Sequence, residues 1–123
     1  ASLIEKETDG KDRTNIASVI YNRLNNVGET YHKLEIDAAV IYGLGYANGE
    51  NYAGPLTQAD LDKDTPYNLR MHEGLPPTPI CSPSLEALKA TLEPTDSDDL
   101  YFYITQDEEY FSQTYEEHQQ SWN

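Results

Sequence analysis

Carboxylates and tyrosines are the side chains of this sequence that offer the most chemistry. The chain has 22 acidic residues and ten tyrosines among its 123 residues. A carboxylic acid can protonate a glycosidic oxygen, and a tyrosine ring offers sugar C–H groups a flat apolar face together with a hydroxyl for sugar oxygens. The composition therefore permits a sugar-cleaving groove, while ordinary packing of tyrosines and exposure of helix glutamates would account for it equally.

Two of the acids flank a lysine near the start of the chain, in the stretch Glu5-Lys6-Glu7-Thr8. A glutamate here is either part of an ordinary exposed helix or a working acid at a helix end. Spacing alone does not select Glu5 or Glu7 from the other acids.

Other chemistries find less support. The three histidines, His32, His72 and His118, have none of the short spacings that mark metal sites, so we expect no metal. The single cysteine, Cys81, excludes an intrachain disulfide and a cysteine zinc site, and we expect it to be a small buried residue. The sequence has neither a P-loop nor a G-x-S-x-G nucleophile motif.

The charge balance restricts the partners. A formal net charge of −14 repels phosphate backbones and anionic lipid surfaces, so nucleic acid is not expected as a partner. No stretch of about 20 apolar residues is present that could cross a membrane.

Several short helices are expected to position the candidate residues. The most regular spans 12–25, where apolar residues recur at helical spacing, followed by the stop signal Gly28. Asp37 can cap a helix over 36–44, and a Thr57-x-x-Asp60 capping box starts another that runs to about residue 63. Two further helices are predicted over 2–8, ended by Asp9-Gly10, and from Ser82 or Ser84 to about residue 93.

The rest of the chain is predicted as loops and a terminal hairpin. Residues 66–83 contain five prolines and should form an ordered loop that buries Tyr67, Leu69, Met71, Leu75 and Ile80. The glycine-rich stretch 43–54 is a second loop. Aromatic and β-branched residues predict strands over 100–105 and 110–114, then a short helix through residue 118. With helices first and strands last, the fold class is α+β.

Leu85, Leu88 and Leu92 recur at i, i+3 and i+7, which predicts an amphipathic helix with a leucine face.

Eight blocks then occur in a recognisable order: ASLIEKET, IASVIYNRL, DAAVIYG, LDKDTPYNLR, GLPPTPICSPS, LEALKATLEP, LYFYIT and a final EEH. Together they resemble the catalytic domain of the YceG-like, MltG-type endolytic murein transglycosylases. The resemblance covers nearly the whole chain, and it identifies residues 1–123 as one such domain, with short helices packed around a small sheet and a C-terminal β-hairpin.

The resemblance implies an enzyme without a cofactor that cuts nascent peptidoglycan glycan strands between N-acetylmuramic acid and N-acetylglucosamine and leaves 1,6-anhydro ends. It implies a membrane-anchored, extracytoplasmic protein in which a transmembrane helix and a LysM-like segment precede this domain. Membrane contact would be made only through that anchor, and cell-wall synthesis proteins are candidate partners.

The resemblance also implies site residues. The catalytic acid of the family is the second glutamate of its E-K-E-T block, which is Glu7 here. Five further residues are expected around the groove, in contact with the substrate or directly behind it: Tyr67, Asn68, Tyr42, Asn22 and Arg23.

The chain departs from the family pattern at three blocks. DAAVIYG replaces D-P-T-V-I-Y-G, YNLR replaces Y-N-T-Y, and Thr78 replaces the second glycine of G-L-P-P-G-P-I. Leu69 and Arg70 therefore change side chains that could carry sugar contacts, whereas Glu7 is retained.

Three alternatives stay open at this point. The chain could be a non-catalytic peptidoglycan-binding module of the same fold, or an adaptor in which Glu7 is fully exposed. Proteins of this type have also been called aminodeoxychorismate lyases, but none of the lysines lies beside a glycine- or serine-rich phosphate cup that pyridoxal phosphate would need.

Overall fold

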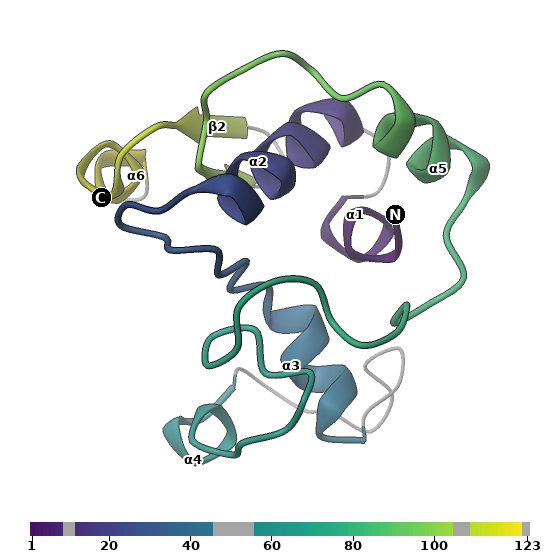
Figure 1. Cartoon of the computed structure of the whole chain (residues 1–123), viewed down its shortest axis with the longest axis vertical. Coiled ribbons are helices and arrows are strands. Elements are labelled where there is room, and N and C mark those ends of the chain that lie inside the picture. The colour runs from purple at the N-terminus through teal and green to yellow at the C-terminus, as the bar shows by residue number, and fades with distance from the viewer. Residues whose placement is uncertain (9–11, 46–55, 105–108, 122–123) are drawn as a thin grey trace.

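The computed structural model describes residues 1–8, 12–45, 56–104 and 109–121 (Figure 1). The described helices are α1 (Ser2–Glu7), α2 (Arg13–Asn25), α3 (Asp37–Gly43), α4 (Gln58–Leu61), α5 (Leu85–Leu92) and α6 (Tyr115–Ser121). The described strands are β1 (Tyr101–Ile104) and β2 (Glu109–Ser112). Short helices around a small sheet with a C-terminal hairpin confirm the predicted α+β class.

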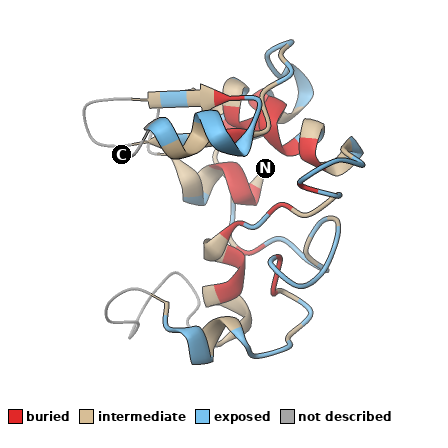
Figure 2. Ribbon diagram, turned by 90° about the vertical axis from the view of Figure 1, so that its left-hand side faces the viewer, coloured by how far each residue is buried: buried red, intermediate tan, exposed pale blue. Residues whose placement is uncertain are grey.

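The core forms where α2 meets its neighbours. Ile16, Ala17 and Val19 are each at most 1% exposed. The helix packs against α1, α5 and β1, and buried residues gather where the helices face one another (Figure 2). The spacing of apolar residues along 12–25 thus predicted both the helix and its buried face.

The two strands form an antiparallel pair with Tyr101 opposite Ser112 and Ile104 opposite Glu109. Phe102 and Phe111 lie opposite each other, with ring centroids 6.4 Å apart. Helix α6 packs back onto both strands, and Phe102, Ile104 and Phe111 of the hairpin pack against the hydrophobic core. The last residue of the first predicted strand, 105, and residues 106–108 between the strands lie outside the described residues.

A second group of elements comprises α3, α4 and the chain from 66 to 80, which lie together in the lower part of Figure 1. The predicted capping box is present, because Thr57 Oγ1 accepts from Asp60 N at 3.1 Å and Asp60 Oδ2 accepts from Thr57 N at 3.0 Å. The helix it starts ends at Leu61, slightly earlier than expected.

Helix α3 lies against the proline-rich loop at a glycine. A Cβ on Gly43 would lie 2.6 Å from Thr65 Oγ1 and 2.8 Å from Tyr67 Cβ. A larger residue at position 43 would therefore require the loop to move away from α3. Residues 46–54 of the predicted glycine-rich loop and the Asp9-Gly10 turn lie outside the described residues.

The structure corrects the predicted leucine face. Leu85, Leu88 and Leu92 are 60%, 46% and 81% exposed, whereas Ala87 and Ala90 are buried. Alanine side chains allow α5 to lie closer to α2 than leucines would. Ser84 caps the helix as predicted, since its Oγ accepts from Ala87 N at 3.2 Å.

Two smaller expectations are also corrected. Of the loop side chains expected to be buried, Leu69 and Ile80 are buried, but Met71 and Leu75 are 39% and 62% exposed. Asp37 makes no side-chain cap and is instead the first residue of α3. Its carboxylate is used elsewhere, as described below.

No helix among the described residues is both long and apolar enough to cross a membrane.

Candidate active site

A cavity of about 300 Å³ lies between the core around α2 and the second group of elements, which comprises α3, α4 and the chain from 66 to 80. It is lined by residues from α1, α2, α3, α6, β1 and two loops: Glu7, Arg23, Leu34, Glu35, Ile36, Asp37, Arg70, Tyr101, Phe102, Tyr115 and His118.

Glu7 is the last residue of α1, and Thr8 after it is extended. The side chain is partly buried at the cavity. Burial first, and then the negative charge of Asp37, raise the pKa of Glu7 from 4.5 to about 7. A carboxyl group with such a pKa is present in both protonation states near neutral pH, so it can donate a proton and later accept one.

Glu5, the other glutamate of the stretch, has a different environment. Its Oε1 accepts a hydrogen bond from Ser84 N at 2.6 Å, ahead of α5. Hydrogen bonding by the Ser84 side chain first, and by its backbone N–H second, holds the pKa of Glu5 below its usual value. Glu5 is therefore an anion that fixes the start of α5, and it does not line the cavity.

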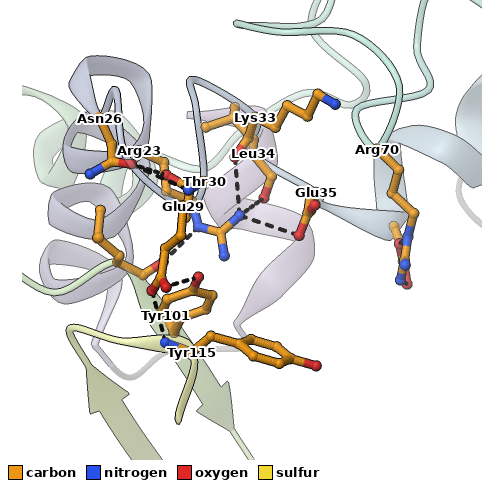
Figure 3. Close-up of polar contacts among 12 residues, drawn as sticks. Arg23, Asn26, Glu29, Thr30, Lys33, Leu34, Glu35, Arg70, Tyr101 and Tyr115 are labelled. Carbon is orange, nitrogen blue, oxygen red and sulfur yellow. Dashed lines mark hydrogen bonds and ion pairs between the residues drawn. The ribbon is translucent and has the colours of Figure 1, made fainter. Parts of the chain in front are cut away.

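Arg23 holds one wall of the cavity in place (Figure 3). The residue is 7% exposed, and it donates to the carbonyl oxygens of Leu100 at 2.6 Å, Lys33 at 3.0 Å and Leu34 at 3.1 Å. Its guanidinium also lies 4.8 Å from the ring centroid of Tyr101 and 3.7 Å from Glu35 Oε2. One side chain thus joins α2, the segment before α3, and β1.

That segment has an unusual backbone. Tyr31, His32 and Glu35 have φ values of 41°, 63° and 52°, in the left-handed region that most side chains avoid. Hydrogen bonds from His32 N to Asn26 O and from Glu35 N to Leu69 O hold these conformations. The result brings the Leu34 carbonyl to Arg23 and the Glu35 side chain to the cavity.

The aromatic wall of the cavity consists of Tyr101, Tyr115 and His118. The ring of Tyr101 stacks on His118, with centroids 5.1 Å apart and planes 23° apart. Glu29 joins the wall from behind, because its Oε1 accepts from Tyr101 Oη at 3.0 Å and from Tyr115 N at 2.8 Å (Figure 3). Burial and the Glu29 hydrogen bond raise the pKa of Tyr101 to about 12, so its hydroxyl stays protonated.

Asp37 and Arg70 form the remaining charged wall. Arg70 Nε lies 2.8 Å from Asp37 Oδ1, and Arg70 Nη2 lies 3.0 Å from Asp37 Oδ2. Both side chains are 44% exposed. This is a two-pronged ion pair between residues that are 33 positions apart.

The structure brings two of the predicted site residues, Glu7 and Arg23, to the same cavity. Asn22 and Asn68 do not line it. Asn22 Nδ2 donates to the carbonyls of Ser97 and Asp99.

Asn68 is 0% exposed and donates to the carbonyls of Leu61 and Lys63. These contacts hold the loop chain together, and a substrate contact for either asparagine stays a prediction.

Tyr42 and Tyr67 also lie away from this cavity. Their rings meet edge to face with centroids 5.0 Å apart. The hydroxyl of Tyr67 lies 2.7 Å from Thr78 Oγ1, so the residue that departs from the family pattern holds this tyrosine. Their predicted sugar contacts also remain untested.

Sequence reasoning did not assign the other nine lining residues to the site: Leu34, Glu35, Ile36, Asp37, Arg70, Tyr101, Phe102, Tyr115 and His118. Tyr101 lies in the LYFYIT block and His118 in the EEH block, but no local spacing connects either block to Glu7. Asp37 was interpreted as a helix cap and Arg70 as a departure from a pattern, so the pair between them was not foreseen.

The described part of the chain offers no further site for cysteine or metal chemistry. Cys81 is half-buried and its Sγ lies 3.4 Å from the carbonyl of Ser2. Within residues 1–8, 12–45, 56–104 and 109–121, no three His, Cys, Asp or Glu side chains are grouped so that they could hold a metal ion.

Comparison with known proteins adds three findings. The model of the YceG-like family matches residues 1–123. The chain is 36% identical over 121 residues to an endolytic murein transglycosylase of Streptococcus pneumoniae and 38% identical over 120 residues to one of Bacillus subtilis. It also resembles the crystal structure of a YceG-like protein from Listeria monocytogenes, with 41% identity and a TM-score of 0.81.

These relatives are much longer than the aligned region. The matches cover 96% of this chain but 21% of the Streptococcus protein and 31% of the Bacillus protein. The structural match covers 97% of this chain and 36% of the Listeria chain.

Proposed function

The chain belongs to the YceG-like family, and from this premise we propose that it is the catalytic domain of an endolytic murein transglycosylase. The proposed reaction cleaves the bond between N-acetylmuramic acid and N-acetylglucosamine in nascent glycan strands and leaves 1,6-anhydro ends. The single observation that carries the proposal is Glu7, a carboxyl group with a pKa raised to about 7 that lines a cavity with an aromatic wall.

Glu7 acts twice in the proposed mechanism. Its protonated carboxyl gives a proton to the glycosidic oxygen, and the bond from that oxygen to muramic C1 breaks as C1 gains oxocarbenium character. The resulting carboxylate then takes the proton of the muramic C6 hydroxyl, whose oxygen forms the new bond to C1. One proton leaves Glu7 and one returns, so neither water nor a second nucleophilic carboxylate is consumed.

The charges of the cavity suit this reaction. Glu35 and Asp37, each paired with an arginine, place carboxylate oxygens on the same cavity as Glu7, and such oxygens stabilise the positive charge that develops on the sugar ring. Asp37 also favours the protonated form of Glu7 before the reaction begins. Within the aromatic wall, the exposed ring of Tyr115 offers a flat apolar surface to a pyranose ring, whereas Tyr101 is 7% exposed and its ring already contacts His118 and Arg23.

The proposed location and partners follow from the proposed substrate. Because peptidoglycan lies outside the cytoplasmic membrane, this domain would work on the extracytoplasmic side, held at the membrane by a segment outside residues 1–123. Proteins of cell-wall synthesis are the candidate partners there.

Digestion of purified peptidoglycan tests the proposal. Wild type should release fragments with 1,6-anhydro ends, detected by mass spectrometry, and Glu7→Gln should release at least 100-fold less, in the range expected for loss of a general acid. Glu5→Gln is the matched control, because it changes the neighbouring glutamate outside the cavity, and it should keep the wild-type rate.

Equal release by wild type and Glu7→Gln would refute the role of Glu7. Glycan binding without any release by wild type would instead support a non-catalytic binding module.

A further inference from the structure

We propose that Arg70 is a positioning residue for the reaction at Glu7. Its bidentate ion pair with Asp37 fixes the position of the Asp37 carboxylate, which acts on Glu7, and partly neutralises the charge of that carboxylate. This inference rests on the proposed function, but it also makes a prediction about the protein without substrate. Arg70 itself need not touch the sugar.

The geometry gives Asp37 one firmly defined position. Asp37 is the first residue of α3, and α3 packs against α1, the helix that ends at Glu7. Both carboxylate oxygens of Asp37 accept hydrogen bonds from the Arg70 guanidinium, from Nε at 2.8 Å and from Nη2 at 3.0 Å. A planar guanidinium that binds both oxygens fixes the orientation of a carboxylate as well as its distance.

The backbone of Arg70 is fixed although its side chain is exposed. Arg70 N donates to Asn68 Oδ1 at 3.1 Å, and Asn68 is buried and bound to two loop carbonyls. The guanidinium therefore extends from a rigid base to the cavity wall. A lysine here could neutralise Asp37 but could not hold both of its oxygens.

The pair also balances charge beside Glu7. Asp37 raises the pKa of Glu7, and a cation bound to Asp37 reduces that effect. The other charged and titratable groups that line the cavity contact one another or Glu29: Arg23 lies 3.7 Å from Glu35, Tyr101 binds Glu29, His118 stacks on Tyr101, and the ring of Tyr115 lies 5.9 Å from that of Tyr101. Arg70 is thus positioned to act on Glu7 through Asp37.

The direction of each effect follows from the charges. Removal of Arg70 leaves Asp37 as an uncompensated anion, so Glu7 should release its proton at higher pH. Removal of the Asp37 charge should let Glu7 release its proton at lower pH. Because the proposed reaction needs protonated Glu7 at its start, the alkaline limb of the rate profile should move with this pKa.

The experiment compares wild type with Arg70→Met, Arg70→Lys, Asp37→Asn and the double variant Asp37→Asn/Arg70→Met. The readout is kcat/KM against pH for release of anhydro fragments from soluble glycan strands. Arg70→Met should move the alkaline limb up by roughly 0.5 pH unit and Asp37→Asn should move it down by roughly 1 unit, as expected for charges near a carboxyl group. Arg70→Lys should restore most of the limb position but not the full rate.

The double variant separates action through Asp37 from direct contact with substrate. With Asn at position 37, Arg70→Met should move the limb by less than roughly 0.2 unit, because its target charge is gone. If Arg70→Met instead raises KM equally in both backgrounds and leaves the limb in place, Arg70 binds substrate directly and the inference is wrong.

A second measurement keeps this inference separate from the proposed function. NMR titration of the Glu7 carboxyl in the folded, substrate-free variants should show the same upward and downward shifts. If wild type releases no product but these shifts occur, the proposed reaction fails and the pairing holds. If Glu7 titrates at the same pH in wild type and Arg70→Met, the inference fails whatever the activity.

Discussion

Two arginines line the same cavity and illustrate how differently one residue type can be used. Arg23 is 7% exposed and donates to three backbone carbonyls, and we call it with those carbonyls the fixed wall. The Arg70 side chain is 44% exposed and binds the carboxylate of Asp37, and we call this pair the ion-pair wall. The fixed wall maintains the shape of the cavity, whereas the ion-pair wall sets the charge beside Glu7.

The largest effect should come from breaking the fixed wall. Arg23→Met removes the guanidinium, which donates hydrogen bonds to the carbonyls of Lys33, Leu34 and Leu100. Leaving buried polar groups without partners should lower the free energy of unfolding by about 4 kcal/mol. Urea denaturation measures this, and Arg70→Met is the control. A loss equal to that of the control would remove the distinction between the walls.

The next effect tests Asn68, which holds the backbone of Arg70 in the ion-pair wall. Asn68→Ala removes the donor to two loop carbonyls and the acceptor for Arg70 N, and should lower the free energy of unfolding by about 3 kcal/mol. Asn25→Ala is the matched control, since Asn25 is exposed and donates to one carbonyl. If both variants unfold at the same urea concentration, the loop does not depend on Asn68.

Glu7, which lies between the walls, should give a pH-dependent effect. Its pKa is raised from 4.5 to about 7, so the folded state binds this proton more tightly than the unfolded state. The free energy of unfolding should therefore fall as pH rises from about 4.5 to about 7. Glu7→Gln cannot ionise and should be more stable than wild type at pH 8 by on the order of 2 kcal/mol, with little difference at pH 4.

Glu5→Gln is again the control for this measurement. The pKa of Glu5 is lowered by its hydrogen bond to Ser84, so its carboxylate stabilises the fold above its unfolded pKa, and that contribution is lost as pH falls. Glu5→Gln should thus be less stable than wild type at pH 8. A gain of stability in both variants would mean that net charge, rather than the site, controls the effect.

The smallest effect should come from Arg70. Its ion pair with Asp37 is exposed, and such pairs contribute less than about 1 kcal/mol and weaken with salt. Denaturation of Arg70→Met at low and high salt should show a small loss that disappears at high salt. A loss comparable to that of Arg23→Met would make Arg70 a structural residue.

Much of the fold could be predicted because its signals are local. Helix α2 follows from apolar spacing, α4 from the Thr57 and Asp60 capping box, and the hairpin from its aromatic strands. The orientation of α5 could not be predicted, since both its leucines and its alanines form an apolar stripe. The alanines face inward because the helix lies close to α2.

The site was less accessible to sequence reasoning. Glu7 was selected by the order of blocks along the whole chain and not by its own neighbours. The pair of Asp37 with Arg70 joins residues 33 positions apart, and the pair of Glu29 with Tyr101 joins residues 72 apart. Contacts over such separations depend on how the helices pack, which no local pattern encodes.

The titration of Glu7 itself is the most direct test of a single carboxyl group that first donates and then accepts a proton. Carbon-13 NMR of the labelled glutamate side chains, with Glu7→Gln to assign the signal, gives its midpoint without any substrate. The cavity geometry predicts a midpoint near pH 7. A midpoint near 4.5, the ordinary value, would mean that Glu7 is ionised at neutral pH and cannot begin the reaction.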